Sequence, residues 1–231
     1  MKVIIASLIV VCALAAAAFP ADTPPPSSAT DALLAELGVK LGSVDTLCAE
    51  FVEERHISIL TEVMTSRGIL FFSKPDRIRL EMTQPYKSIL LAAGDSVARY
   101  EFVDGRWQKL DAGDAAAAAV VTGQIAAWLA GRFSDSTNVF DITAQFGAED
   151  QVVLTPKNAK LAEAISSIAL TLTSAHDGVT SVLVTQPDGD FTRMVFSDVR
   201  KNIALDAALF DTSLDVPSPG EALSDAKDSS Q

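Results

Sequence analysis

Apolar and polar side chains alternate at period two through the run from Ser66 to Leu91. In its middle section Ile78, Leu80 and Met82 share the face opposite two arginines and a glutamate, which is typical of a strand with one apolar face. Lys-Pro-Asp and Gln-Pro interrupt the run, because proline cannot donate a hydrogen bond to a sheet. The pattern predicts three strands of an antiparallel meander, with the apolar face turned toward protein or toward a bound molecule.

The rest of the chain repeats this strand pattern and adds two helical segments. Thr30-Asp31 offers a helix N-cap before leucines spaced for one helix face, and the helix is expected to stop around Gly42. A second, Ala-rich helical insertion is expected from Asp114 to Phe133. About ten short strands make up the remainder, with Asp-Gly pairs as hairpin turns. Two helices are too few to cover so many strands as a flat layer. We therefore expect a mainly β protein with helices (α+β), in which a strongly curved antiparallel sheet forms a half-open barrel. The N-terminal helix and the central insertion cover its mouth.

The two ends of the chain differ from the middle. Residues 1–19 contain one lysine, an apolar stretch and then small residues, the form of a cleaved secretory signal peptide. An uncleaved membrane anchor and a lipidated Cys12 are alternatives. Residues 20–29 form a Pro/Ser-rich leader, 30–220 a single domain and 221–231 a disordered tail.

Charge and candidate chemistry exclude several function classes. The formal net charge of −12 argues against a nucleic-acid partner. His56 and His176 are expected to be solvated, and Cys48 to be a buried apolar group that cannot form an intrachain disulfide after signal cleavage. Asp188-Gly189-Asp190 is better explained as a hairpin tip than as a calcium loop. No catalytic motif, metal spacing or cofactor fingerprint is present, so we expect a protein that is not an enzyme and has no metal or cofactor. A secreted hydrolase on a β scaffold remains an alternative.

Several short motifs, in order, resemble the periplasmic outer-membrane lipoprotein carrier family (LolA-like). The resemblance runs from about Leu33 to Gly220. Its motifs are Gly68 opening a strand, Lys74-Pro75, the charged strand Arg77 to Met82, Thr83-Gln84-Pro85, Ser88-Ile89-Leu90, Leu154-Thr155-Pro156-Lys157, Phe210 and Pro217 to Gly220.

The resemblance implies an apolar cavity that shields acyl chains beneath helical lids. The candidate cavity residues are Leu70, Phe72, Ile78, Leu80, Met82, Ile89, Leu91, Tyr100, Phe102, Phe140, Ile142 and Phe146. The candidate lid contacts are Leu33, Leu37, Val120, Ile125, Trp128 and Leu129. A solid, closed core made of the same residues is the alternative that the sequence alone favours. Leu80 stands where relatives often carry an aromatic residue.

Lys74 is the candidate lid latch. In the family a basic residue before this proline, typically arginine, bonds backbone carbonyls of the covering helices. Lysine lacks the planar fork of arginine, so we expect a weaker latch here or one shared with Arg67 or Arg77. A solvated lysine at a strand end is the alternative.

The resemblance also implies a location and partners. These are the periplasm, acylated lipoproteins as cargo, an inner-membrane ABC-type exporter and an outer-membrane receptor lipoprotein, with the carrier a monomer. A carrier for another amphiphile, such as a glycolipid or pigment-linked lipid, and a lipid-sensing regulatory module are the alternatives on the same fold.

Overall fold

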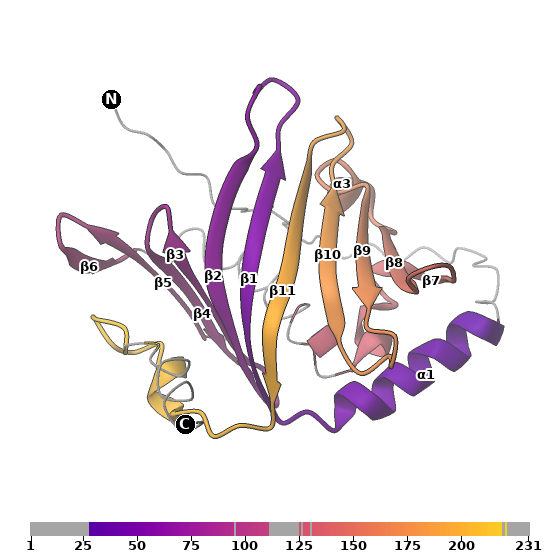
Figure 1. The fold of residues 1–231 in the computed structure, drawn as a ribbon, viewed down its shortest axis with the longest axis horizontal. Helices are drawn as coiled ribbons and strands as arrows, with labels where there is room; N and C mark the ends of the chain where they lie inside the picture. The colour runs from indigo at the N-terminus through magenta and orange to yellow at the C-terminus, as the bar shows by residue number, and fades with distance from the viewer. Residues whose placement is uncertain are drawn as a thin grey trace, which may run out of the picture.

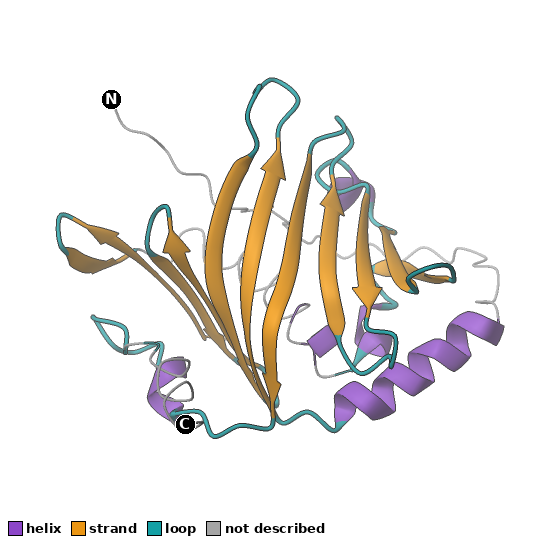
Figure 2. Cartoon of the chain, viewed as in Figure 1, coloured by secondary structure: helices purple, strands orange, loops and turns teal. Residues whose placement is uncertain are grey.

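The computed structural model describes residues 28–94, 96–110, 125, 127–129, 131–218 and 220. Within them one sheet of eleven antiparallel strands dominates (Figures 1 and 2). The strands are β1 (Thr46–His56), β2 (Met64–Ser73), β3 (Arg77–Gln84), β4 (Ser88–Ala93), β5 (Ser96–Val103), β6 (Arg106–Lys109), β7 (Phe140–Gln145), β8 (Gln151–Pro156), β9 (Ser167–Leu172), β10 (Val179–Thr185) and β11 (Phe191–Lys201). The helical elements are α1 (Ser28–Gly42), α3 (Ala159–Ala162), η2 (Phe133–Ser136) and η3 (Ala207–Phe210).

The sheet is two meanders joined in the middle. Its order is β6-β5-β4-β3-β2-β1-β11-β10-β9-β8-β7, so the first and last strands of the chain are neighbours. Phe51 of β1 pairs with Phe196 of β11, and both strands are eleven residues long. The edge strands β6 and β7 do not pair with each other, so the sheet is curved but open. This confirms the predicted fold class.

Turn chemistry sets the hairpins where Asp-Gly pairs predict them. Asp104 and Gly105 both have positive φ between β5 and β6, the conformation that a two-residue hairpin turn requires. Gly189 has φ 91° in the turn between β10 and β11. These turns set the register within the β5–β6 and β10–β11 hairpins.

One face of the sheet, here called the inner face, carries two joined apolar clusters. Leu70, Phe72 and Ile78 of β2 and β3 pack with β1. Under the other meander, Leu33 and Leu37 of α1 pack on β7 to β9 together with Trp128 and Phe133. Ile125 contacts both clusters. The first helix thus covers the inner face of the β7–β10 half (Figure 1).

The opposite face, here called the outer face, is also covered, which the alternation pattern does not predict. Residues 203–218, here called the C-terminal strap, run under β3 to β5, and Leu209 and Phe210 pack against Phe71 and Tyr100. Tyr100 donates its hydroxyl to the carbonyl of Leu214 at 2.7 Å. Arg79, which the pattern puts on a polar face, is fully buried and bonds the carbonyls of Leu209 and Ser218.

The Ala-rich insertion lies mostly outside the described residues, as do the signal peptide, most of the leader and the disordered tail that the sequence predicts. Within the insertion, residues 127–129 are helical. Gly131 follows with φ 74°, and its N–H bonds the carbonyl of Trp128 at 2.9 Å.

Candidate functional site

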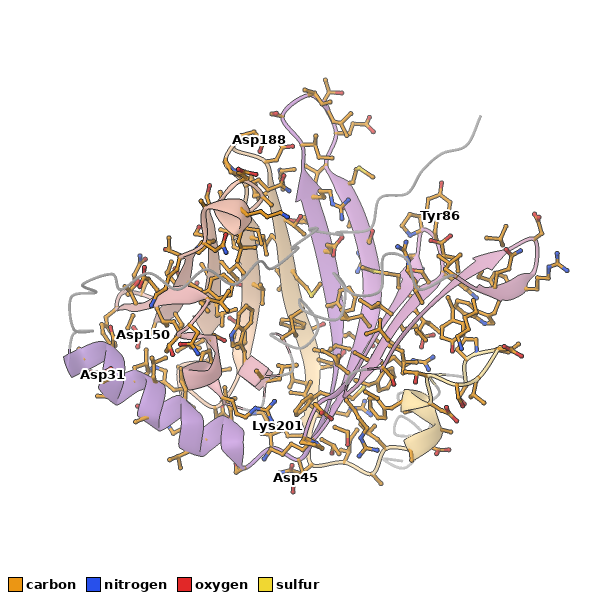
Figure 3. All side chains as sticks on the ribbon, turned by 180° about the vertical axis from the view of Figure 1, so that it is seen from behind. Asp31, Asp45, Tyr86, Asp150, Asp188 and Lys201 are labelled. Carbon is orange, nitrogen blue, oxygen red and sulfur yellow. The ribbon has the colours of Figure 1, made fainter. Side chains whose placement is uncertain are left out.

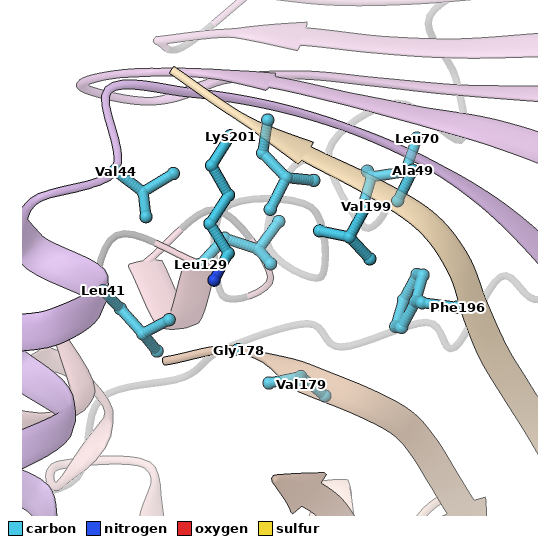
Figure 4. Close-up of a pocket in the computed structure, with 11 residues that line it drawn as sticks. Leu41, Val44, Ala49, Leu70, Leu129, Gly178, Val179, Phe196, Val199 and Lys201 are labelled. Atoms are coloured by element: carbon cyan, nitrogen blue, oxygen red, sulfur yellow. The ribbon is translucent and has the colours of Figure 1, made fainter. Parts of the chain in front are cut away.

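An apolar pocket lies on the inner face where β1 and β11 join, beside the C-terminal end of α1 (Figure 4). Five elements (α1, β1, β2, β10 and β11) and the short helix at 127–129 meet there. The lining residues are Leu41, Val44, Leu47, Ala49, Leu70, Leu129, Gly178, Val179, Phe196, Val199 and Lys201.

The inner-face cluster beside the pocket includes a close contact at Gly68. A Cβ atom at this position would lie 2.3 Å from the carbonyl oxygen of Glu81 and 2.5 Å from the ring of Phe51. Glycine therefore lets the Phe51 ring lie across β2 within the inner-face cluster. The structure places Gly68 inside β2 and not at its start, and this contact explains why the strand has a glycine there.

The pocket is small in this structure. Its volume is about 30 Å³, room for about two water molecules at the roughly 15 Å³ that each water centre needs. An acyl chain would not fit without movement of a wall. The lining residues outside the sheet are Leu41 and Val44 around the end of α1, Leu129, and Gly178 in the turn before β10.

Lys201 brings the only charged side chain among the lining residues. Its ammonium group donates to the carbonyl of Asp177 at 2.6 Å and to the Asp177 carboxylate at 2.7 Å. The bond from Lys201, with a second from Thr173, holds the pKa of Asp177 below its ordinary value. The charge at the rim is thus neutralised, and the interior of the pocket stays apolar.

Lys74 contacts the end of the covering helix. Its ammonium group donates to the carbonyl of Gly42, the last residue of α1, and lies 3.4 Å from the Asp45 carboxylate. Arg132 donates to the neighbouring carbonyl of Pro75 at 3.1 Å, from the segment that follows the helix at 127–129. The turn between β2 and β3 is therefore bonded to both covering segments.

The other two candidate latch residues have different contacts. Arg77 bonds Ser73 and the carbonyl of Lys74, and its guanidinium lies over the Phe210 ring. It braces the turn and the C-terminal strap. Arg67 is exposed on β2, where its carbonyl accepts from Thr83.

Helix α1 has further tethers at the turn after β9. Lys40 donates to the carbonyl of Ala175, and His176 lies 3.4 Å from Glu36 and 2.9 Å from Asp150. The hydrogen bonds from Lys40 and His176 hold the pKa of Glu36 below its ordinary value. His176, predicted to be solvated, is instead a bridge between α1 and two loops.

A close backbone crossing joins α1 to the short helix. A Cβ atom at Gly131 would lie 3.0 Å from the backbone nitrogen of Gly42 and 3.1 Å from Cα of Gly38. Only small residues allow this approach. The two covering segments thus meet near the pocket.

The structure brings together seven of the twelve candidate cavity residues on the inner face. They are Leu70, Phe72, Ile78, Leu80, Met82, Phe140 and Ile142. Of these, Leu70 lines the pocket itself.

The other five candidates lie elsewhere, and their assignment to the same cavity face was wrong. Ile89, Leu91 and Tyr100 belong to the outer-face cluster, because Leu80 pairs with Leu90 and so places the odd-numbered residues of β4 opposite. Phe102 is 40% exposed and stacks edge-on with Trp107. Phe146 lies beyond the end of β7 and is 57% exposed.

Five of the six candidate lid contacts lie among the described residues. Leu33, Leu37 and Trp128 are buried in the α1 cluster, and Trp128 donates to Ser136 at 2.8 Å. Ile125 touches both inner clusters and Leu129 lines the pocket. Val120 lies outside the described residues.

Several pocket residues were not among the sequence candidates. Leu47 and Ala49 alternate on β1, which is a usable signal, but the charged residues after Phe51 mask it. Val179, Phe196 and Val199 come from strands whose two faces are almost equally polar. Their position follows from pairing with β1, which no local pattern reveals.

The structure gives no site for other chemistry in its described part. His56 stacks on Phe191 at 4.1 Å between ring centroids. Cys48 is buried, and burial raises the pKa of its thiol to about 11. Within the described ranges no cluster of three or more His, Cys, Asp or Glu side chains is arranged to bind a metal ion. None of the helices described has the length and hydropathy that crossing a membrane requires.

Solved structures with similar folds are of low sequence identity. A DUF1329 family protein from Desulfovibrio piger is 12% identical at a TM-score of 0.47, covering 82% of this chain and 99% of that one. A LolA superfamily protein from Nitrosomonas europaea is 11% identical at a TM-score of 0.41, covering 79% of this chain and 97% of that one. MucB is 16% identical at a TM-score of 0.43, covering 84% of this chain and 66% of that one. No curated protein matches the chain in sequence.

A family model gives the assignment. The model of the outer membrane lipoprotein carrier protein LolA matches residues 42–213, from the last residue of α1 into the C-terminal strap. The match covers most of the chain and all eleven strands. The chain therefore belongs to the LolA family of outer membrane lipoprotein carrier proteins.

Proposed function

We propose that this protein is a periplasmic carrier that shields the acyl chains of lipoproteins on the inner face of its sheet. The observation that carries the proposal is the apolar pocket beneath the end of α1, bonded shut through Lys74. Family membership supports a carrier role. We propose an inner-membrane ABC-type exporter as the donor and an outer-membrane receptor lipoprotein as the acceptor.

The small pocket corresponds to the closed conformation of such a carrier. Each buried methylene contributes about 0.8 kcal/mol, so one long acyl chain can offset several hydrogen bonds at the cover. The chain would displace α1 and Leu129 and extend over Leu70, Phe196 and their inner-face neighbours. When the acyl chain leaves, α1 returns and Lys74 bonds the carbonyl of Gly42 again.

Site-specific photo-crosslinking in cell envelopes tests cargo and location together. A photoreactive residue at Leu129 is expected to capture acylated lipoproteins, identified by mass spectrometry. The same residue at Phe102, an exposed outer-face position, should capture none. Capture of a glycolipid or pigment-linked lipid instead would show that the cargo is another amphiphile and not a lipoprotein. Equal yields at both positions would contradict the inner face as the binding surface.

The latch is tested separately with purified protein. Lys74→Ala removes the bond to Gly42 and is expected to speed both uptake and loss of a fluorescent fatty acid several-fold. Lys74→Arg should restore slow exchange, because a guanidinium can reach the same carbonyl. Lys157→Ala serves as the matched control, since Lys157 pairs with exposed Asp141 at the far edge of the sheet. Unchanged exchange in Lys74→Ala would contradict the latch and leave the carrier role standing.

A further inference from the structure

The connection between β1 and β2 carries an unusual set of exposed apolar side chains. Residues 57–64, here called the β1–β2 tip, project beyond the neighbouring strands at the end of the sheet away from the C-terminal end of α1 (Figure 1). Ile59 is 88% exposed, and Leu60, Val63 and Met64 are 46%, 45% and 49% exposed. No partner within the described chain covers them.

The composition of the tip is not explained by turn formation. Turns favour glycine, proline, asparagine, aspartate and serine, and of these the tip has only Ser58. Its sequence, ISILTEVM, carries one charge, Glu62. Exposed contiguous apolar residues on a protein surface usually mark a site of interaction.

The base of the tip is held in a fixed geometry. The N–H of Leu60 bonds the carbonyl of Ile57 at 2.9 Å, and the N–H of Ser58 bonds the Asp190 carboxylate at 2.7 Å. Below it, His56 stacks on Phe191. The apolar side chains are thus presented at one place rather than spread along a loose loop.

Shape and size identify a bilayer as the occupant. Four side chains on a narrow convex tip fall far short of the roughly 800 Å² per partner that a stable protein interface buries, which excludes a second copy of this chain. The hydrocarbon boundary of a bilayer needs no matching groove, and shallow insertion there is reversible. Tyr86, 61% exposed in the β3–β4 turn, also projects toward this end of the sheet (Figure 3) and suits the headgroup region.

Charge selects the kind of bilayer. Glu62 lies within the tip, Asp190 is bonded to it, and Asp188 is bonded to Asp190. Anionic headgroups would be repelled by this group of carboxylates. We propose that the β1–β2 tip inserts into the interfacial region of zwitterionic membranes and holds the protein reversibly at their surface. The inference does not rest on the proposed carrier function.

Fluorescence from tryptophan introduced at Ile59 tests the insertion. The full chain carrying Ile59→Trp is mixed with phosphatidylethanolamine–phosphatidylcholine vesicles whose acyl chains are brominated. The added tryptophan is expected to shift to the blue and to be quenched at least twofold more than the tryptophan of Val39→Trp. Val39 is a matched control because it is 77% exposed on α1. Both variants keep the apolar N-terminal residues, so only local insertion separates them.

A second pair of variants tests whether the apolar side chains of the tip are needed for vesicle binding. Ile59→Asp with Leu60→Asp is expected to lower the vesicle-bound fraction at least fivefold relative to Val39→Asp. Fatty-acid uptake on the inner face should stay unchanged in the double variant. Failure of uptake in the unmodified protein would therefore contradict the carrier proposal alone.

Three outcomes would overturn the inference. Equal quenching of the tryptophans at positions 59 and 39 would contradict insertion of the tip. Vesicle binding that requires the anionic lipid phosphatidylglycerol would show that electrostatic attraction, and not insertion of the tip, holds the protein at the membrane. Photo-crosslinking from position 59 in cell envelopes to a protein, without lipid quenching, assigns the tip to a protein partner.

Discussion

Gly68 is the residue at which the inner face is most sensitive to a single added methyl group. In Gly68→Ala the new Cβ meets the carbonyl oxygen of Glu81 and the Phe51 ring, and the backbone atom cannot rotate away. We expect a loss of about 2 kcal/mol in the free energy of unfolding, measured by urea denaturation. Gly147→Ala is the control, since its Cβ would have one neighbour at 3.9 Å. A loss no greater than in the control would show that β2 and β3 can separate freely.

Glu53, buried on the inner face of β1, gives a pH dependence with a definite sign. Burial raises the pKa of its carboxyl above 4.5, and Arg55 opposes the shift only partly. The folded state then holds a proton that the unfolded state has released, so stability falls as the pH rises from 4.5 through the raised pKa.

Glu53→Gln is expected to remove this dependence and to raise the melting temperature at pH 7 relative to the unmodified protein. Thermal unfolding at pH 4 and pH 7 measures both effects. The half-buried neighbour Glu54 serves as the control, and Glu54→Gln should change the melting temperature less than Glu53→Gln at either pH. A lower melting temperature at pH 7 for Glu53→Gln would indicate that the ion pair with Arg55 outweighs desolvation.

At the scale of elements, the C-terminal strap is held by a buried arginine. Arg79 is fully buried, bonds Glu81 at 2.7 Å and donates to the carbonyls of Leu209 and Ser218. In Arg79→Met the Glu81 carboxylate loses its partner, at a cost of about 3 kcal/mol. Amide hydrogen exchange at residues 207–214 is expected to accelerate.

Arg99→Met provides the matched comparison, because Arg99 and Glu101 form the same kind of i, i+2 pair at 2.8 Å in a partly exposed place. Its loss should cost less than about 1 kcal/mol and leave exchange in the strap unchanged. Equal effects of the two substitutions would mean that apolar packing of Leu209 and Phe210, rather than Arg79, holds the strap.

At the scale of the whole molecule, the pairing of the first and last strands joins two half-sheets. A chain ending at residue 190 lacks β11 and leaves β1 and β10 as bare edges. Exposed edges of long strands pair with other chains. We expect this truncated protein to aggregate, measured by size-exclusion chromatography and light scattering. A soluble monomer with native circular dichroism would show that the half-sheets are stable without β11.

The sequence predicts the architecture better than it predicts the site. Alternation at Ile78 and Leu80 is unambiguous and identifies the inner face correctly. In β4 the residues Ile89, Leu90 and Leu91 are apolar in succession, so the face depends on pairing with β3, which is not a local property. The strap is equally hidden, because Leu209 and Phe210 sit in a segment without periodicity.

Because Cys48 is buried beneath that strap, its reaction with a thiol reagent can be used to measure how often the strap opens. The thiol lies in one cluster with Phe71, Leu209 and Phe210, and its pKa of about 11 leaves almost no reactive thiolate at neutral pH. A thiol-modifying reagent reaches the buried sulfur when the strap lifts or the chain unfolds. The rate of alkylation at Cys48 therefore counts strap openings, without any label or substitution being introduced.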